Sequence, residues 1–379
     1  MTQPRRCNLG FIGCGQLMTH QHIQNAHRSR ICRIHTLCDI DVAKMEAVAR
    51  RYPPVKTTAD YRRMLADPEV ELVVIAMNPE KHAALAIEAL EAGKDVYVEK
   101  PMGVSVAECR RIARAAKRTG RRLTTGFNRR FAPAYVDLKP YLSPRTGGLK
   151  MFYRIADFER WERADADRVL HEVVHIFDIL CFLVGAEPVR VFAVRGTHHN
   201  DAIITLEFAD RSIASILSTG RTEAIPKERL EIHWDRRAAE VEAFIEARYY
   251  HIPGAPDVTR FAGRVSDKAT SLAYVKKFQS AKGLDCLRAR CRDSARVYDD
   301  YEAGRITREQ LVSGAAGYTE DKGWAGALDE MALSILEDRL PRNVTAVEGT
   351  RAVVLAEAAN KSIATGRPVT LSPRQWECA

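Results

Sequence analysis

The chain has 379 residues, a formal net charge of +9 and 46% hydrophobic residues. This length exceeds what one hydrophobic core usually supports, so we expect two domains. No apolar run reaches the roughly 18 residues of a membrane span, and the start of the chain does not resemble a secretion signal, so we expect a cytoplasmic protein. The cationic residues are scattered among carboxylates, which argues against a nucleic-acid partner. Nine cysteines without a Cys-x-x-Cys pair are interpreted as reduced thiols that pack in the core.

The first 126 residues alternate short apolar runs with longer amphipathic stretches. This order is typical of strands that alternate with helices and pair in a parallel sheet. One expected helix ends at Gly93, and another begins at the capping sequence Ser105-Val106-Ala107-Glu108 and ends at Gly120. The expected strands cover residues 7–12, 34–38, 72–77, 95–99 and 123–126. Residues 1–126 are therefore predicted to form an α/β Rossmann domain with a doubly wound parallel sheet.

The pattern changes in residues 127–379, where alternating segments follow one another without helices between them. This predicts a second, α+β domain with an open, mostly antiparallel sheet. Residues 253–319 are polar and are interpreted as a variable elaboration. A helix is expected from residue 344 to 365, ending at Gly366, with a short segment at 368–371 after it. The expected strands include residues 189–194, 203–208 and 212–217.

A glycine-containing turn follows the first expected strand. Gly13 permits a tight turn, and Gly15 lets the backbone approach a pyrophosphate at the N-terminus of the next helix, beside Gln16 and Leu17. Met18 stands where this motif usually has a third small residue. The motif therefore predicts a dinucleotide site, and an ordinary strand–turn–helix is the alternative.

Asp39 lies at the end of the second expected strand, where a carboxylate accepts both hydroxyls of the adenosine ribose. Its other interpretation is a helix cap, but Asp41 is better placed for that role. The next residue, Ile40, offers no donor to a 2′-phosphate, unlike an arginine or a serine. The sequence therefore predicts NAD as the cofactor and disfavours NADP.

Four motifs are found along the chain: Met77-Asn78-Pro79-Glu80-Lys81-His82, Val98-Glu99-Lys100-Pro101, Gly126-Phe127-Asn128-Arg129-Arg130-Phe131 and His175-Ile176-Phe177-Asp178. Together they resemble the glucose-fructose oxidoreductase and inositol dehydrogenase family, or Gfo/Idh/MocA family. The resemblance covers nearly the whole chain and is weakest at residues 253–319. It implies a Rossmann domain followed by an α/β domain with an open mixed sheet. It also implies oxidation or reduction of sugars, polyols and related compounds with NAD(P).

The resemblance implies that Lys100 lies near the nicotinamide and the substrate hydroxyl. An ammonium at the carboxyl end of a central parallel strand points into the crevice where such sheets bind ligands, and there it stabilises a developing alkoxide. A surface ion pair between Glu99 and Lys100 is the alternative. We expect Glu99 to orient Lys100, and Asn78 with His82 to shape the nicotinamide pocket.

Asn128, Arg129 and Arg130 follow the last Rossmann strand, where the family places groups that line the cleft. We assign Asn128 to the cofactor site and Arg129 to the substrate site, because a guanidinium binds sugar hydroxyls or phosphate well. Bracing of the domain junction by these residues is an equal alternative. The aromatic residues Tyr153 and Trp161 are interpreted as core residues.

Residues 167–184 have helical apolar spacing and contain His171-Glu172-Val173-Val174-His175. The pattern matches the zinc-binding motif His-Glu-x-x-His. A zinc peptidase needs a third ligand, but Cys181 stands six residues after His175 and no glycine or histidine follows at the required spacing, so we expect no metal. The resemblance implies instead that His175 exchanges the hydroxyl proton of the substrate.

The relay that would orient His175 departs from the family pattern. Many members have an aspartate four residues before this histidine, where the chain has His171. Glu172 and Asp178 each lie three residues from His175, and with His171 they are the candidates for the relay. Two histidines held in an interdomain core are the alternative.

The sequence thus predicts a dehydrogenase that transfers a hydride between the nicotinamide and a carbinol carbon of a sugar, cyclitol or related polyol. Two other hypotheses stay open: an NAD-dependent glycosidase that oxidises its substrate transiently, and a dinucleotide-binding regulator without turnover. The expected partners are a small polyol substrate and further copies of the chain, in a homodimer or a homotetramer.

Overall fold

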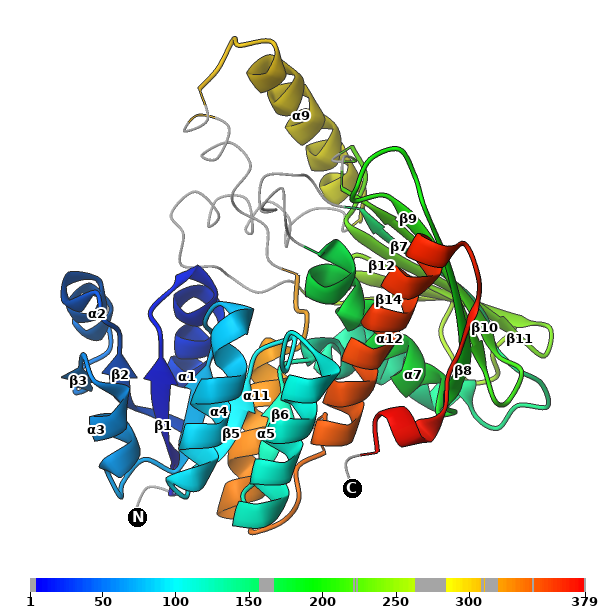
Figure 1. The fold of residues 1–379 in the computed structure, drawn as a ribbon. Coiled ribbons are helices and arrows are strands. Elements are labelled where there is room, and N and C mark those ends of the chain that lie inside the picture. The colour runs from blue at the N-terminus through cyan, green and yellow to red at the C-terminus, as the bar shows by residue number, and fades with distance from the viewer. Residues whose placement is uncertain are drawn as a thin grey trace.

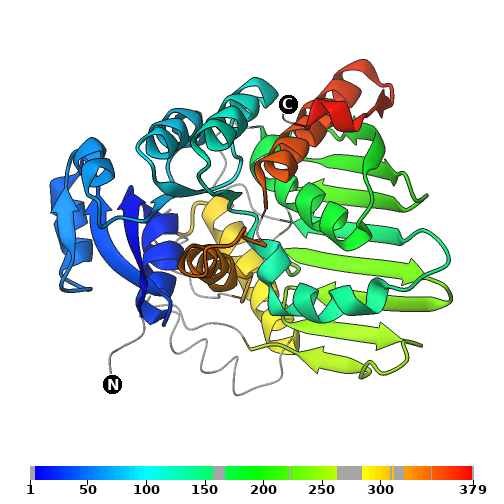
Figure 2. The ribbon, with the colours of Figure 1, turned by 90° about the horizontal axis from the view of Figure 1, so that it is seen from below.

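The computed structural model describes residues 5–156, 167–220, 222, 224–262, 284–307, 310, 320–342 and 344–377. Two β-sheets lie at opposite sides of the molecule, with helices α11, α12 and α7 between them (Figures 1 and 2). Within this part of the chain, no helix has both the length and the apolar character needed to cross a membrane.

The first sheet has six strands in the order β3-β2-β1-β4-β5-β6, and all neighbouring strands are parallel. Its central strands are apolar and buried along their whole length, as expected for a parallel sheet covered on both faces. The expected doubly wound Rossmann fold is confirmed, with one edge strand, β3, that the sequence pattern did not indicate. The strands are β1 (Cys7–Ile12), β2 (Cys32–Cys38), β3 (Lys56–Thr58), β4 (Leu72–Ile75), β5 (Asp95–Val98) and β6 (Leu123–Thr125).

The helices of this domain begin and end at residues that the sequence marks. The side chain of Ser105 accepts a hydrogen bond from the backbone N–H of Glu108 at the start of α5, and Gly120 ends that helix at a φ of 66°. Asp41 caps α2 in the same way. The helices are α1 (Gln24–Arg28), which continues a π-helical segment (Met18–Ile23), α2 (Val42–Ala49), α3 (Tyr61–Ala66), α4 (His82–Glu91), which continues a 3-10 turn (Pro79–Lys81), and α5 (Val106–Thr119).

The second sheet has nine strands in the order β14-β13-β12-β11-β7-β10-β9-β8-β15. Among the strands that the structure describes, β7 and β10 are parallel and all other neighbours are antiparallel. This confirms the predicted open, mostly antiparallel sheet. The strands are β7 (Lys150–Ala156), β8 (Pro188–Arg195), β9 (Ala202–Phe208), β10 (Ile213–Thr219), β11 (Glu228–Trp234), β12 (Arg237–Glu242), β13 (Glu246–Tyr250), β14 (Val258–Arg260) and β15 (Val369–Thr370).

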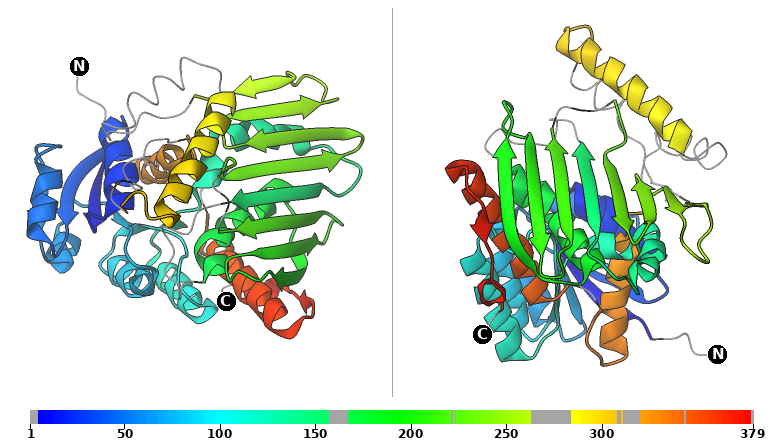
Figure 3. Two further views of the ribbon diagram at one scale, coloured as in Figure 1. Left: turned by 90° about the horizontal axis from the view of Figure 1, so that it is seen from above. Right: turned by 90° about the vertical axis from the view of Figure 1, so that its right-hand side faces the viewer.

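Helices cover one face of this sheet, and its other face is open in the right-hand view of Figure 3. Helix α12 (Ala346–Thr365) touches both domains, because Val353 packs in the core of the first sheet and Leu355 in the core of the second. It begins at the capping box of Thr345 and Glu348 and ends at Gly366. The other helices on this face are α6 (Pro133–Leu138), between 3-10 turns at Asn128–Phe131 and Lys139–Leu142, and α7 (Val174–Val184), which continues a π-helical segment (Val169–Val173).

Helix α11 (Trp324–Leu336) comes late in the chain but packs against the first sheet. Its residues Leu328 and Met331 belong to the same core as Leu9 of β1. Gly323 precedes it with a φ of 89°, and a Cβ there would lie 2.3 Å from the main-chain oxygen of Asn128. The division of the domains at residue 126 stays a prediction, and α11 shows that the later part of the chain contributes to the first core.

The elaboration predicted at residues 253–319 is described only in part. It contains β14 and helix α9 (Leu284–Glu302), which projects away from both sheets (Figures 1 and 3). Leu284 and Leu287 at its start pack against Ala243 and Ile245. Six described cysteines are buried, in agreement with a packing role: Cys7, Cys14, Cys32, Cys38, Cys109 and Cys181.

Candidate active site

The loop after β1 requires glycine at one position and leaves room at another. Gly13 has a φ of 94°, and a Cβ on it would lie 2.5 Å from the sulfur of Met77. A Cβ on Gly15 would meet no atom within 4 Å, so the protein's own packing does not require glycine there. This open space fits a loop that a pyrophosphate approaches closely. Met18, in place of the third small residue, is fully buried in the core of the first domain.

Asp39 accepts two hydrogen bonds from main-chain amides. Its Oδ2 accepts from the N–H of Cys14 at 2.6 Å, and its Oδ1 accepts from the N–H of Asp41 at 2.9 Å. Asp39 therefore fastens the glycine loop to the end of β2, and Asp41 caps α2, as predicted. A carboxylate has about four acceptor positions, so Asp39 keeps capacity for the hydroxyls of a ribose. Ile40 beside it is 86% exposed.

Three of the residues predicted to bind the cofactor are exposed at the same edge of the sheet. Gln16 and Leu17 follow the glycine loop, and Asn78 follows β4. Since the carboxyl ends of parallel strands meet at one edge, these positions fit a dinucleotide laid across it.

His82 has a structural role in this geometry. The side chain is buried, with Nδ1 2.7 Å from the carbonyl oxygen of Pro101 and Nε2 3.0 Å from that of Met77. Burial lowers the pKa of His82, although the two carbonyl groups oppose that shift. His82 therefore ties the loop after β4 to the loop after β5, and it shapes the nicotinamide region through these loops.

Glu99 is buried below Lys100 and does not bind the lysine ammonium. Its Oε1 lies 2.8 Å from Nε2 of His22, and its Oε2 accepts from the main-chain N–H of Lys100 at 3.1 Å. Burial opposes its ionisation, but the hydrogen bond from His22 and the charge of Lys100 lower the pKa of Glu99. A Cβ on Gly126 would lie 2.8 Å from this carboxyl group, so Gly126 makes room for it. Glu99 thus orients Lys100 through the backbone.

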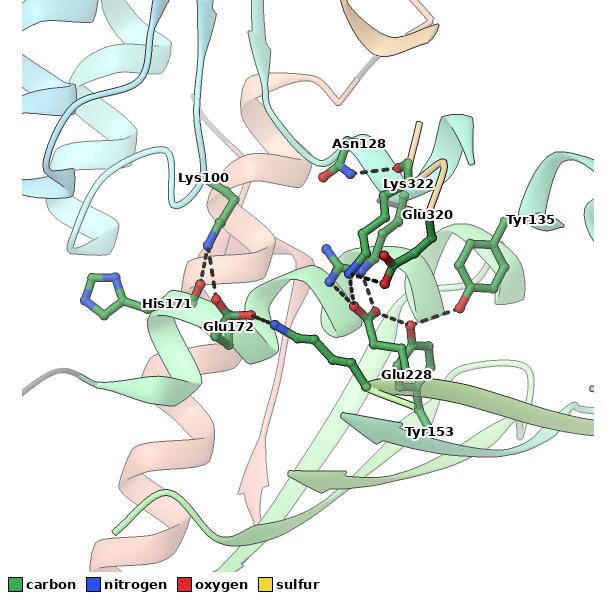
Figure 4. A network of polar contacts seen from close by, with 11 residues as sticks. Lys100, Asn128, Tyr135, Tyr153, His171, Glu172, Glu228, Glu320 and Lys322 are labelled. Carbon is green, nitrogen blue, oxygen red and sulfur yellow. Dashed lines mark hydrogen bonds and ion pairs between the residues drawn. The ribbon is translucent and has the colours of Figure 1, made fainter. Parts of the chain in front are cut away.

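Lys100 reaches from the first domain to a helix of the second (Figure 4). Its Nζ donates to the main-chain oxygen of His171 at 2.5 Å and lies 4.0 Å from Oε1 of Glu172. The other carboxylate oxygen of Glu172 lies 3.3 Å from Nζ of Lys227. Burial disfavours the charge of Glu172, but Lys227 and Lys100 outweigh it and hold its pKa well below the usual range. The surface ion pair between Glu99 and Lys100 is therefore not formed, and Glu172 is the acidic partner of Lys100.

His175 lies one turn after His171 on the same helical stretch. It is 6% exposed, its ring packs edge to face on Phe127, and its Nδ1 has no hydrogen-bond partner among the described residues. Burial lowers the pKa of His175 well below its ordinary value of 6.5, and the nearby cations Arg129 and Lys100 lower it further. The imidazole is therefore neutral near pH 7, as a proton acceptor must be.

The candidates for the relay do not bind His175. Both carboxylate oxygens of Asp178 accept from Arg130, at 2.9 and 2.5 Å, and a third nitrogen of Arg130 donates to Glu348 of α12 at 2.6 Å. In this structure Asp178 binds Arg130 and makes no hydrogen bond to His175, so the expected role of Asp178 in orienting His175 is not supported. Arg130 braces α7 against α12.

Arg129 also braces the structure. Its Nε and Nη2 donate to the two carboxylate oxygens of Glu228 at 2.8 and 2.7 Å, and its side chain is 4% exposed. The expected contact of Arg129 with the substrate is not supported, because little of the guanidinium is accessible. Asn128 is fully buried, and its amide donates to the main-chain oxygen of Lys322 at 2.7 Å, so direct contact with the cofactor is not supported either.

Glu228 is the centre of a buried polar network that sequence reasoning missed (Figure 4). Besides Arg129, it accepts from the hydroxyl of Tyr153 at 2.7 Å and from Nζ of Lys322 at 3.2 Å. The hydroxyl of Tyr135 donates to that of Tyr153 at 2.9 Å. Although burial opposes its ionisation, Arg129 and Lys322 hold the pKa of Glu228 well below its usual range. Tyr153 is a core residue, as expected, and Trp161 lies outside the described residues.

The pattern His171-Glu172-Val173-Val174-His175 does not gather metal ligands in the described part of the chain. The one group of three suitable side chains there is His35, Asp67 and Glu69, on the first domain. The ammonium of Lys56 lies 2.9 Å from Asp67 and 3.0 Å from Glu69, so both carboxylates already have a cationic partner.

Comparison with known proteins agrees with this geometry. Residues 7–127 match the model of an oxidoreductase family with an NAD-binding Rossmann fold. Inositol 2-dehydrogenase 2 of Saccharopolyspora erythraea is 27% identical over 378 residues, which cover 97% of this chain and 96% of that protein. Inositol 2-dehydrogenase of Acidothermus cellulolyticus is 30% identical over 210 residues, 53% of this chain. The match spans 60% of the Acidothermus enzyme and 59% of its counterpart in Lactiplantibacillus plantarum.

Solved structures share the fold of the whole chain. Myo-inositol dehydrogenase from Corynebacterium glutamicum has a TM-score of 0.70 at 16% identity, covering 97% of this chain and 100% of its own. The WlbA dehydrogenase from Bordetella pertussis, solved with NADH and UDP-GlcNAcA, has a TM-score of 0.69 at 17% identity over 97% of this chain and 99% of its own. The resemblance predicted from the sequence is confirmed for the first domain: residues 7–127 match the NAD-binding Rossmann domain of the Gfo/Idh/MocA oxidoreductases, and the whole chain is similar to inositol 2-dehydrogenases and shares the fold of solved dehydrogenases.

Proposed function

We propose that the chain is an NAD-dependent dehydrogenase that oxidises a carbinol carbon of a sugar, cyclitol or related polyol to a carbonyl, or catalyses the reverse reduction. One observation carries this proposal: Lys100 of the first domain hydrogen-bonds the helical stretch that carries His175 of the second. A cation to stabilise the oxygen and a neutral base to take its proton are the two groups that removal of a hydroxyl proton requires. The names of the relatives, inositol 2-dehydrogenases, support a polyol as the substrate.

The residues of the chain have separate tasks in this proposal. The nicotinamide, when bound, supplies the hydride acceptor. Lys100 donates to the substrate oxygen and stabilises the negative charge that develops there. His175 accepts the hydroxyl proton at a ring nitrogen, and its burial keeps water from competing for that nitrogen. Glu99 and His22 act beneath Lys100 and fix its backbone.

NAD is proposed over NADP because of the two residues that follow β2, Asp39 and Ile40. The carboxylate of Asp39 would repel a 2′-phosphate, and exposed Ile40 offers that phosphate no donor. The hydrogen bonds of Asp39 to Cys14 and Asp41 support a carboxylate that is fixed in place.

A homo-oligomer is proposed through the open face of the second sheet. Phe152, Phe192, Val194, Ile203 and Ile213 are between 37% and 48% exposed. These side chains lie on the same face of the sheet. Phe152 and Phe192 belong to one row of paired residues across the strands, which also contains Ser215 and Thr205. Val194 pairs directly with Ile203. Exposed apolar residues gathered on one face favour a protein contact, and a second copy covers the same face symmetrically.

The experiment is a screen of sugars and cyclitols with NAD, read at the absorbance of NADH. Oxidation of at least one polyol, lost in Lys100→Ala, is the expected result. If the protein binds NADH but no sugar or cyclitol in either direction is turned over, the proposal is wrong and a binding protein is the better account.

A further inference from the structure

The ammonium of Lys100 uses part of its donor capacity within the described residues. It has three N–H donors, and one of them goes to the main-chain oxygen of His171 at 2.5 Å. The carboxylate of Glu172 stands beside it but beyond hydrogen-bond distance, with Oε1 4.0 Å from the ammonium nitrogen (Figure 4). Lys100 therefore keeps donors for a substrate hydroxyl, next to an acidic group.

Glu172 has one oxygen engaged and one that is available. Its Oε2 accepts a hydrogen bond from Nζ of Lys227 at 3.3 Å, whereas no donor of the described part of the chain lies within hydrogen-bond distance of Oε1. The side chain is 29% exposed, so a ligand can reach it. Since the neighbouring lysines hold its pKa well below the usual range, Glu172 is ionised near pH 7. An ionised carboxylate is an acceptor only, so Oε1 can receive a hydrogen bond from a ligand hydroxyl.

Other carboxylates around the site are closed to a ligand. Glu99, Asp178 and Glu228 are each at most 3% exposed, and donors of the protein occupy both oxygens of each one. Glu320 pairs with a different lysine, 3.3 Å from its carboxylate, and lies away from Lys100 in Figure 4. Among these groups, Glu172 combines exposure, a free oxygen and a place beside Lys100.

Glu172 also lies close to the proposed base. Glu172 and His175 are three residues apart on one helical stretch, and side chains with this spacing are neighbours on a helix surface. The charges of Lys100 and Lys227 act on both side chains. Hydrogen bonds of about 2.8 Å to Lys100 and to Oε1 would bring the two bound oxygens close together. Neighbouring hydroxyls on one sugar or cyclitol ring present their oxygens in this way.

We infer that Glu172 determines specificity: its Oε1 accepts a hydrogen bond from the hydroxyl next to the one that reacts, so the substrate is a vicinal diol. This inference rests on the proposed dehydrogenase function and names its substrate class. The hydrogen bond is charge-assisted, and it fixes the ring with one carbinol carbon at Lys100 and His175. A polyol without the neighbouring hydroxyl leaves the carboxylate without this donor and binds less tightly.

The test compares polyols with analogues that lack one hydroxyl. Glucose and its 2-, 3-, 4- and 6-deoxy analogues form one set, and myo-inositol and its mono-deoxy analogues form another. Binding to the protein with NADH is measured by calorimetry, oxidation with NAD by absorbance, and the oxidised carbon is identified from the product. Loss of a hydroxyl next to that carbon should weaken binding about tenfold or more, since a hydrogen bond to a charged group contributes about 10- to 100-fold. Loss of a distant hydroxyl should have a smaller effect.

Variants of Glu172 separate recognition of the hydroxyl from a structural effect. Glu172→Gln keeps an oxygen for Lys227 but removes the charge, so it should weaken binding of the parent polyol about fivefold and leave the analogue without the neighbouring hydroxyl unchanged. A role that is only structural, through Lys100, would weaken both ligands equally. Glu172→Asp restores the charge and should recover part of the difference. Glu231→Gln, 38% exposed on β11, is the matched control and should change neither affinity.

Two outcomes overturn the inference: analogues without the neighbouring hydroxyl bind as tightly as their parents, or Glu172→Gln weakens parent and analogue by the same factor. If either is found while polyols are oxidised, the dehydrogenase stands and the role of Glu172 is rejected. If parent polyols bind through Glu172 but nothing is oxidised or reduced, the hydroxyl site stands and the dehydrogenase is rejected. If no member of either set binds or reacts, both are rejected.

Discussion

Replacing Glu228 with glutamine should destabilise the protein more than any surface change on the same strand. The carboxylate is 2% exposed and receives hydrogen bonds from Arg129, Tyr153 and Lys322. Removing one charge from a buried pair costs about 3–5 kcal/mol because the partner charge is left uncompensated. Glutamine keeps one acceptor oxygen, so we expect a loss near the lower limit, about 3 kcal/mol.

The matched control is Glu231→Gln, on the same strand β11. Glu231 is 38% exposed and pairs with Arg229 and His233 at the surface, so its loss should change the free energy of unfolding by at most about 0.5 kcal/mol. Urea denaturation followed by circular dichroism measures both variants. For a slope of about 3 kcal/mol per molar, the midpoint of Glu228→Gln should fall by roughly 1 M.

The effect of Glu228 has a defined pH dependence. Its pKa in the folded protein is held below the usual 4.5, so the unfolded state binds more protons as the pH falls. The stability from ionised Glu228 is therefore fully present above pH 4.5 and is lost progressively as the pH falls below it. The difference between the wild type and Glu228→Gln should shrink in the same range. A Glu228→Gln variant as stable as Glu231→Gln at pH 7 would refute this account of the network.

Three further predictions concern the cofactor loop and the histidine pattern. The protein should bind NADH more tightly than NADPH in a fluorescence titration. Asp39→Asn should narrow the difference in affinity, because the amide does not repel the 2′-phosphate. Equal affinity of the wild type for both cofactors would contradict the role of Asp39. Gly15→Ala should weaken NADH binding without changing the melting temperature, because the added Cβ meets no protein atom. Gly13→Ala should lower the free energy of unfolding by about 1 kcal/mol or more, because Gly13 has a positive φ and its Cβ would contact Met77. A stable Gly13→Ala variant with unchanged NADH binding would speak against this geometry. Elemental analysis should find no stoichiometric zinc, since no third ligand joins His171 and His175 among the described residues. About one zinc per chain, with activity lost on treatment with a chelator, would contradict this prediction.

Much of the fold follows from local sequence signals. The buried strands of the first sheet read as apolar runs, and the ends of α5 and α12 are marked by Ser105, Gly120 and Gly366, whose conformations the structure bears out. The position of α11 could not be read in this way, because its packing on the first sheet depends on contacts between elements about three hundred positions apart, such as β1 and α11. Periodicity reports which face of a helix is buried and not which core it enters.

The site was predicted in outline from motifs, and its partners were not. The motif with Lys100 and the helix with His175 were recognised, and the structure brings these two elements into contact. Glu228 and Lys322 carry no local signal, because a buried ion pair looks in the sequence like any exposed charge. The spacing of Asp178 from His175 suggests a contact between the two side chains, yet Asp178 binds Arg130, since spacing along a helix does not show which neighbouring element supplies a partner.

Lys100 and His175 should both be required for turnover and neither for cofactor binding. Lys100→Ala or His175→Ala should lower kcat about 10²- to 10⁴-fold, because each acts on charge that appears as the hydroxyl proton leaves. The dissociation constant of NADH should stay nearly unchanged. The double variant should be little worse than the poorer single variant, since two groups that serve one proton transfer act as a unit.

The most direct test of this account is the pH dependence of kcat/KM for oxidation in the wild type and in His175→Ala. His175 must be neutral to accept the proton, and burial together with the neighbouring cations holds its pKa well below 6.5. The wild-type rate should therefore rise with pH on a limb that lies below pH 6.5 and level off before neutral pH. This limb should vanish in His175→Ala and persist in His233→Ala, a control on β11 whose side chain is 54% exposed. A His175→Ala variant that keeps most of kcat and the same limb would contradict the assignment of His175 as the base.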